Sequence, residues 1–265
     1  MNPRLQLRRY SRSEDRKLKA YEKKYAKSIL TSLNRQLNEA VRNIDAGGIF
    51  LDVSMNDVLA DLYRKVGVDM ANTQFDALTS FKTKASNFFL NAWLDFMTNY
   101  ITTSMAGRVA GINETTRKKI QETISLGFNL GMTNDQIAKF LREKVSKFNV
   151  YRSIMIARTE IAEAANVAKD KSAEDWKQET GESMLWKVWI HRYANEPRTF
   201  HIDQDNGKAI PENAKFQVTN PNTGGIDEMA RPHDSAGGAV QNVNCSCTVI
   251  YVSESYARRL NSKKA

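Results

Sequence analysis

Residues 153–176 read SIMIARTEIAEAANVAKDKSAEDW, and they stand where a helical pattern gives way to a mixed one. Apolar residues recur every three or four positions, which places them along one narrow face of a helix. The apolar face comprises Ile154, Ala157, Ile161, Ala164 and Ala168, and a polar face nearly opposite comprises Thr159, Glu163, Asn166 and Asp170. The sequence therefore predicts an amphipathic helix whose small alanines allow a neighbouring element to approach closely.

The N-terminal residues have the periodicity of one long helix. Ser11 to Glu14 match a capping box, which is typical of a helix start. Apolar residues then follow in steps of three or four from Leu18 to Ile44. The pattern predicts a helix from Ser11 that ends at the Gly47-Gly48 pair.

Further helices are predicted between this rod and residue 153. We expect short helices between 55 and 80 with a break at Gly67, and an aromatic helix from Ser86 that breaks at Gly107 and Gly111. A helix over about 114–129 follows, and a second capping box, Thr133 to Gln136, opens a helix through about Lys144.

After Trp176 the sequence changes to aromatic and β-branched segments that favour strands. The candidate strands are LWKVWIHRY (185–193), GKAI (207–210), KFQVT (215–219) and CTVIYV (247–252), with a long loop over 218–244 and a basic tail. The predicted fold class is α+β. It combines a mostly helical N-terminal region with long helices, reaching about residue 178, and a small C-terminal α+β module with short antiparallel strands.

The charge is concentrated near the N-terminus. The 265-residue chain carries a net charge of +9, and residues 1–45 hold twelve lysines and arginines against five acids, an excess of seven. An acidic partner is expected from such a balance. The candidate nucleic-acid-binding or portal-binding residues are Arg8, Arg9, Arg12, Arg16, Lys19, Lys23 and Lys27. Two alternatives stay open for them: the solvated face of a bundle helix, or an arm that binds a partner or nucleic acid.

No secretory signal or convincing membrane span is recognisable, and two cysteines in so long a chain do not make a disulfide framework. The cytoplasm is therefore the expected compartment. Motifs for nucleotide phosphates, for the HExxH zinc site and for the serine nucleophile elbow are also lacking.

Titratable residues gather in the C-terminal part. Two thiols at i and i+2 of a strand point to the same side, so Cys245 and Cys247 with His201 and His233 form a candidate zinc site. The alternatives are two buried structural thiols with hydrogen-bonded histidines, or a catalytic thiol. Of these, we expect a structural role, with or without zinc, and no catalytic residue.

The order of several motifs resembles the phage head morphogenesis family, the Mu F-like minor head proteins. The motifs are ARTE at 157–160, WKVW at 186–189, RTFH at 198–201, DNG at 205–207 and RPHDSAGGAVQNVNCSC at 231–247, followed by TVIYV. The resemblance covers roughly residues 150–252, and Ser246 stands where the family usually has an arginine between the cysteines. It divides the chain into a helical assembly-binding region, 1–150, and a head morphogenesis module, 151–265.

The resemblance implies a minor capsid protein associated with the portal vertex, acting in head morphogenesis and in genome packaging or delivery. The implied partners are the portal protein, the major capsid or scaffolding protein and phage DNA, with no membrane. The implied locations are the virion head near the portal and the host cytoplasm during assembly. No enzymatic activity is expected. The alternatives are a zinc-dependent enzyme acting on nucleic acid, with Asp205 or Asp234 positioning water, and a basic DNA-binding protein.

Overall fold

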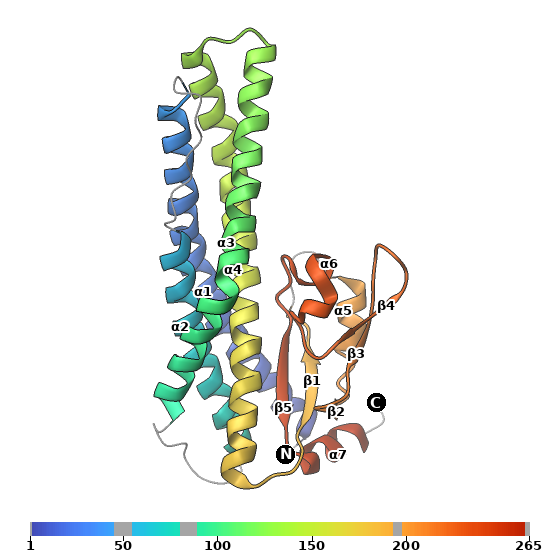
Figure 1. The fold of residues 1–265 in the computed structure, drawn as a ribbon. Helices are drawn as coiled ribbons and strands as arrows, with labels where there is room; N and C mark the ends of the chain where they lie inside the picture. The colour runs from blue at the N-terminus through green and yellow to red at the C-terminus, as the bar shows by residue number, and fades with distance from the viewer. Residues whose placement is uncertain (1, 45–54, 80–88, 193–197, 263–265) are drawn as a thin grey trace. The chain divides into compact units, whose positions relative to one another are not determined.

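The structure is a computed structural model, and it describes residues 2–44, 55–79, 89–192 and 198–262, without the side chain of Met105. Four long helices come first: α1 Pro3–Arg42, α2 Met55–Thr79, α3 Phe89–Asn129 and α4 Asn134–Thr180. The mixed part follows (Figure 1), with β1 Trp186–Ile190, α5 Thr199–Gln204, β2 Ile210–Pro211, β3 Phe216–Thr219, β4 Ile226–Met229, η1 Ser235–Gly237, α6 Gly238–Asn242, β5 Thr248–Val252 and α7 Glu254–Ser262. The α+β fold class is confirmed.

The chain forms two compact units, each assembled from separate segments. The mixed unit comprises Met1–Tyr21, Leu62–Thr98 and Arg158–Ala265, and the helical unit comprises Glu22–Asp61 and Asn99–Ala157. Each long helix contributes residues to both units. The division into functional regions at residue 150 stays a prediction.

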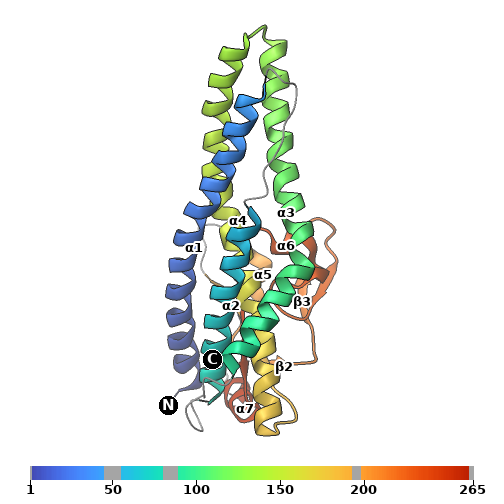
Figure 2. The same cartoon turned by 60° about the vertical axis from the view of Figure 1, so that its left-hand side comes forward.

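The helical unit has an aliphatic core. One buried cluster in this unit comprises Leu37, Ala40, Ile120, Ile137, Leu141 and Val145. Figure 2 shows the end of α3 and the start of α4 as antiparallel neighbours joined by a short turn. The predicted capping box at that turn is confirmed: the Thr133 amide donates to Gln136 Oε1 at 2.8 Å, and the Gln136 amide donates to Thr133 Oγ1 at 3.4 Å.

The mixed unit contains a three-stranded antiparallel sheet in the order β2-β1-β5 and a two-stranded sheet of β3 and β4. Because side chains alternate along a strand, β1 contributes to two cores. Val188 and Ile190 join a cluster with Leu7 of α1 and Leu260 of α7, whereas Trp189 joins a second cluster with both cysteines. Both chain ends therefore contribute to the core around this sheet.

The outer edge of β5 is closed by side chains from the long helices. Asn166 Nδ2 donates to the Cys247 carbonyl at 3.1 Å, and the Val249 amide donates to Asn166 Oδ1 at 2.8 Å. Gln74 makes the same pair of bonds with the Tyr251 carbonyl and amide, at 2.9 and 3.1 Å. Backbone groups that would be unpaired on an edge strand are thus satisfied.

The predicted start of the first helix is wrong, because α1 begins at Pro3. Ser11 lies inside the helix, and the Glu14 side chain does not cap a helix start at Ser11. The Glu14 carboxylate is instead buried against Lys169 of α4. Tertiary contacts therefore stabilise helix in the residues before Ser11, although the local sequence there resembles a helix start. The helix ends at Arg42, and the predicted stop at Gly47-Gly48 lies outside the described residues.

The predicted breaks at glycines are also wrong. Helix α2 continues through Gly67, and α3 continues through Gly107 and Gly111. Gly67 has a packing reason, since a Cβ there would lie 2.6 Å from two atoms of the buried Met97 side chain. A single glycine costs a helix only about 1 kcal/mol, which the surrounding packing outweighs.

Two other expectations need correction. The helix that opens at Thr133 does not end near Lys144 but runs to Thr180, so α4 includes the amphipathic stretch quoted above. Within that stretch Glu163 and Asn166 of the polar face are buried, whereas Ile154 of the apolar face is exposed. The predicted loop over 218–244 contains β4, η1 and α6, and the basic tail forms α7.

None of the described helices carries a segment both long and apolar enough to span a bilayer.

Candidate metal centre

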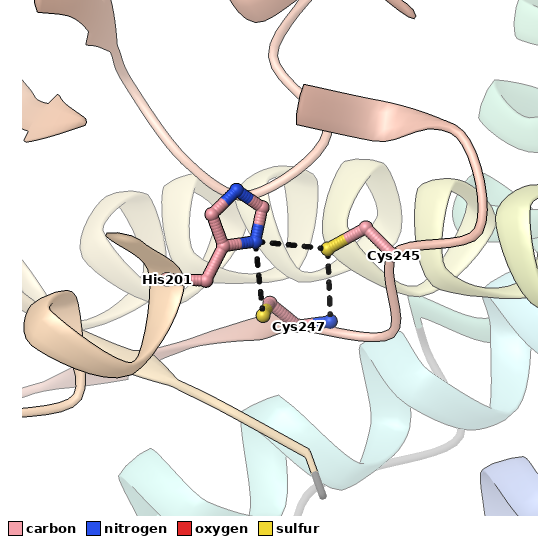
Figure 3. A group of neighbouring side chains, drawn as sticks. All are labelled: His201, Cys245 and Cys247. Carbon is pink, nitrogen blue, oxygen red and sulfur yellow. Dashed lines mark hydrogen bonds between the residues drawn. The ribbon is translucent and has the colours of Figure 1, made fainter. Parts of the chain in front are cut away.

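Three of the four predicted ligands meet in the mixed unit (Figure 3). His201 projects from α5, and Cys245 and Cys247 lie in the segment between α6 and β5. His201 Nδ1 is 3.4 Å from Cys245 Sγ and 3.5 Å from Cys247 Sγ. All three side chains are buried, and their candidate ligand atoms lie within 4.8 Å of one another. The cysteines were predicted to lie in the final strand, but both precede β5. Both sulfurs still face His201.

The tautomer of His201 is fixed by Gln241 of α6. Gln241 Nε2 donates to the Thr219 carbonyl at 3.0 Å and to Asp227 Oδ2 at 2.9 Å, so its Oε1 is the acceptor that remains. That oxygen lies 2.8 Å from His201 Nε2, which must therefore carry the proton. The lone pair of Nδ1 then points at the two sulfurs. Such a hydrogen bond on the far ring nitrogen is the usual support of a metal-binding histidine.

The spacing suits a tetrahedral ion. Zinc bonds of about 2.3 Å to sulfur and 2.0–2.1 Å to nitrogen place tetrahedral N and S ligands about 3.6 Å apart. The two His201–sulfur distances, 3.4 and 3.5 Å, come close to this value. Two thiols and one imidazole are also the donors that soft and borderline metals such as zinc prefer. The group could hold a metal ion.

The two thiols have different proton affinities. A hydrogen bond from the Cys247 thiol lowers the pKa of Cys245 well below its usual value, although burial opposes this. Burial raises the pKa of Cys247 well above its usual value, and the neighbouring Cys245 adds to the effect. Without a metal, Cys245 is thus the better thiolate and Cys247 keeps its proton. A bound cation would displace that proton, as thiolate ligation requires.

The structure does not bring His233 into this group. Its Nε2 donates to the Cys245 carbonyl at 3.0 Å, and its Nδ1 is 4.0 Å from Glu163 Oε2. The backbone at His233 has a φ of 62°, which sets the direction of the ring. His233 therefore supports the loop that carries Cys245, and it is also among the groups that lower the pKa of the Cys245 thiol.

The remaining titratable candidates also serve other contacts. Asp205 Oδ2 accepts from the His191 amide at 3.2 Å. Asp234 accepts from the Ala236 amide at 3.0 Å and so caps η1. None of these carboxylates belongs to the group that His201 forms with the cysteines among the described residues.

Several residues that hold the cysteine segment were missed in the sequence. Arg158 Nη1 donates to Asn244 Oδ1 at 2.7 Å, and the Asn244 amide donates to Thr159 Oγ1 at 2.8 Å. Asn244 has a φ of 59°, a conformation that asparagine adopts more readily than most residues. Arg198 binds the carbonyls of Gln241 and Val243 at 2.7 and 2.6 Å. In the sequence, only the order of the motifs suggested that these residues contact the cysteine segment. The type of residue alone, such as an arginine or an amide, does not predict a particular hydrogen-bond partner.

The seven candidate cations of α1 are all exposed. Lys23 and Lys27 belong to the helical unit and the other five to the mixed unit. Lys19 pairs with Asp15 at 2.7 Å. Arg8, Arg12 and Lys19 face one cavity, whereas Arg9 and Arg16 do not line it.

No protein-family model matches the chain, and comparisons with curated proteins and with solved structures likewise found no match.

Proposed function

We propose that this chain is a minor head protein of a tailed bacteriophage that associates with the portal vertex during head assembly and genome packaging or delivery. The proposal rests on the ordered motifs that resemble the phage head morphogenesis family. One observation supports it most: residues of separate motifs bond to one another. Arg158 of ARTE holds Asn244 of NCSC, and His201 of RTFH faces both cysteines. The motif set thus behaves as the framework of one module.

In this proposal the cationic face of α1 binds the acidic surface of the portal. The decisive test is a pull-down with the portal protein of the same phage. A deletion of the N-terminus is unsuitable, because Leu7 and Leu18 of α1 are buried in the structure. The triple variant Arg16→Gln, Lys23→Gln and Lys27→Gln removes three exposed charges and leaves those core residues in place.

A matched control removes three exposed charges elsewhere, with Lys118→Gln, Lys139→Gln and Arg142→Gln. We expect the α1 triple variant to lose about tenfold or more in portal affinity, because several charge-assisted contacts are lost, while the control binds like the wild type. Absence of the protein from purified heads and procapsids would overturn the proposal. Retention by phage DNA but not by the portal would favour the DNA-binding alternative.

The metal group acts as a structural brace in this proposal, with zinc held by His201, Cys245 and Cys247. We expect about one zinc per chain in the purified wild type, and much less in Cys247→Ser. A chelator is expected to lower the Tm of the wild type, because metal binding adds to the free energy of unfolding.

Cys247→Ala combined with Cys245→Ala provides the control, since it removes both thiols without adding polar groups. This variant is expected to be insensitive to chelator. Substoichiometric zinc in the wild type, together with an unchanged Tm after chelation, would contradict the metal brace and leave the portal proposal standing.

One observation favours the zinc-dependent enzyme as a second candidate. Three protein ligands leave one position of a tetrahedral ion open, as in catalytic zinc sites. Against it, His201 is 2% exposed and the cysteines 5% and 2%, so a nucleic-acid substrate has little access. Zinc-dependent cleavage of DNA or RNA by the wild type, abolished in Cys247→Ser, would establish the enzyme and displace the structural role.

A further inference from the structure

A cavity of about 650 Å³ lies in the mixed unit between the start of α1 and the chain that follows β1 and α5. This volume is in the range of small-molecule sites. Five cations line it: Arg4, Arg8, Arg12, Lys19 and Arg192. Two carboxylates, Asp15 and Asp205, also line it, so five positive charges face two negative ones, an excess of three. The cavity therefore favours an anionic occupant.

The helical spacing puts the arginines in one row. Arg4, Arg8 and Arg12 follow one another at every fourth position of α1, which places them on the same face. A rise of 1.5 Å per residue separates successive arginines by about 6 Å along the helix. The row therefore offers positive charge at successive points along one wall of the cavity.

The acids of the cavity already have partners. Asp15 accepts from Lys19 at 2.7 Å and from Arg192 at 2.8 Å, and Asp205 accepts from the His191 amide at 3.2 Å. By contrast, Arg8 and Arg12 make no hydrogen bond or ion pair with any of the residues that the structure describes, although the charge of Arg8 opposes the rise that burial causes in the pKa of Asp205. Their guanidinium groups are available to a ligand.

The backbone that carries this row is anchored on both sides. Leu7 is buried in the core of the sheet, and the Tyr256 hydroxyl donates to the Pro3 carbonyl at 2.5 Å. The Asp15–Arg192 pair joins α1 to the end of β1. The cations thus project from a fixed frame, which lowers the entropy cost of binding.

We propose that this cavity binds a ligand with two or more linked phosphate groups, held chiefly by Arg8 and Arg12. The planar guanidinium group suits phosphate because it donates two parallel hydrogen bonds. Successive arginines about 6 Å apart along the helix can each donate to a different phosphate, which favours a ligand that carries more than one phosphate. The ligand comes either as a free polyphosphate, such as a nucleoside triphosphate, or as consecutive phosphodiesters of a nucleic-acid strand. This site requires no portal contact and is independent of the function proposed above.

The test compares two double variants of the full chain by titration. Arg8→Gln/Arg12→Gln removes the cavity arginines, and Lys118→Gln/Arg142→Gln removes two exposed cations that do not line the cavity. The probes are inorganic triphosphate, a nucleoside triphosphate and a short fluorescent single-stranded DNA. Circular dichroism and Tm verify that both variants are folded.

We expect the cavity variant to lose about tenfold or more in affinity, because hydrogen bonds to charged groups are lost. The control variant should lose about threefold or less, the size of a general surface-charge effect. Triphosphate bound as tightly as DNA identifies a small phosphate ligand, and much tighter DNA binding identifies a strand. Equal losses in the two variants, or no saturable binding of any probe by the wild type, would overturn the proposal.

Discussion

Lys169 of α4 is fully buried, and two partners from distant parts of the chain place its ammonium group. Glu14 Oε1 lies at 2.5 Å and the Val249 carbonyl at 2.9 Å. Burial lowers the pKa of Lys169, and the Glu14 carboxylate partly opposes that shift. A buried charge of this kind is tolerated only with its partner, so each residue of the pair depends on the other.

Replacing one member of this pair is expected to be costly. Lys169→Met leaves the Glu14 carboxylate buried without its cation, and Glu14→Met does the converse. Each single variant should lose about 3–5 kcal/mol in the free energy of unfolding. The double variant should lose clearly less than the sum, by about 1–3 kcal/mol. Urea unfolding measures all three, and strictly additive losses would show that the two charges act independently.

A pH dependence is expected at Asp15. Burial alone would raise the pKa of Asp15, but hydrogen bonds from Lys19 and Arg192 outweigh it and lower the pKa from its usual 3.8. A carboxylate with a lowered folded-state pKa stabilises the fold above its unfolded pKa, and this contribution disappears as the pH falls through the folded-state pKa. Asp15→Asn should therefore be less stable than the wild type at neutral pH. The difference should shrink as the pH falls below 3.8.

Urea unfolding at several pH values measures this difference. Asp203→Asn, at an exposed aspartate of α5, is the matched control for the loss of one carboxylate. A constant gap between Asp15→Asn and the wild type down to strongly acid pH would rule out the contribution of the Asp15 carboxylate.

At the scale of the elements, glycines inside the long helices have different surroundings. Gly67 of α2 faces the buried side chain of Met97 in α3, whereas nothing lies within 4 Å of a Cβ built on Gly107 of α3. The first glycine allows two helices to approach closely. The second has no such packing role, so it carries only the entropic cost of glycine in a helix.

Alanine at these two positions should act in opposite directions. Gly67→Ala puts a Cβ 2.6 Å from Met97 atoms and should lower the free energy of unfolding by about 1–3 kcal/mol. Gly107→Ala should raise it by about 0.5–1 kcal/mol. Adding Met97→Ala to Gly67→Ala is expected to add less than Met97→Ala costs alone. Thermal and urea unfolding provide the values, and stabilisation by Gly67→Ala would refute this view of the α2–α3 contact.

The elements also show where sequence reasoning succeeds and fails. The capping box at Thr133 was predictable because both of its bonds lie within one turn, and the pairing of His201 with the cysteines followed from their alternation. The predicted helix breaks at glycines were wrong. At Gly67 the local sequence contained no warning, because the side chain that packs against this glycine, Met97, belongs to a different helix. His233 lies outside the three-residue group, because its Nε2 donates to the Cys245 carbonyl. Gln241 gave no signal, since its role depends on three partners that only the fold brings together.

At the scale of the whole molecule, the mixed unit is built from three segments far apart in the chain. Residues 3–21 of α1 supply Leu7 to the sheet core, Glu14 to Lys169 and Asp15 to Arg192. The N-terminal segment is therefore an integral part of the unit that carries the candidate metal centre. A removable arm would not make these contacts.

Deleting residues 2–21 should unfold the mixed unit. The loss combines exposed core residues with an unpaired buried Lys169, and we expect it to exceed about 5 kcal/mol. Near-ultraviolet circular dichroism should lose the signal of the buried Trp189. A peptide of residues 2–21 added in trans should restore part of it. A truncated protein with the wild-type unfolding midpoint would contradict the structure at this point.

The bond between Tyr256 and Pro3 joins residues 253 positions apart. During synthesis, the first helix leaves the ribosome long before its partner strand and helix exist. At 5–20 residues per second that delay is on the order of 10–50 s. Throughout this interval the apolar side chains of the first helix lack their final cover. The mixed unit is therefore completed only after Tyr256 has been synthesised and has left the ribosome, and a chaperone that binds the nascent N-terminus is expected to raise the yield of folded protein.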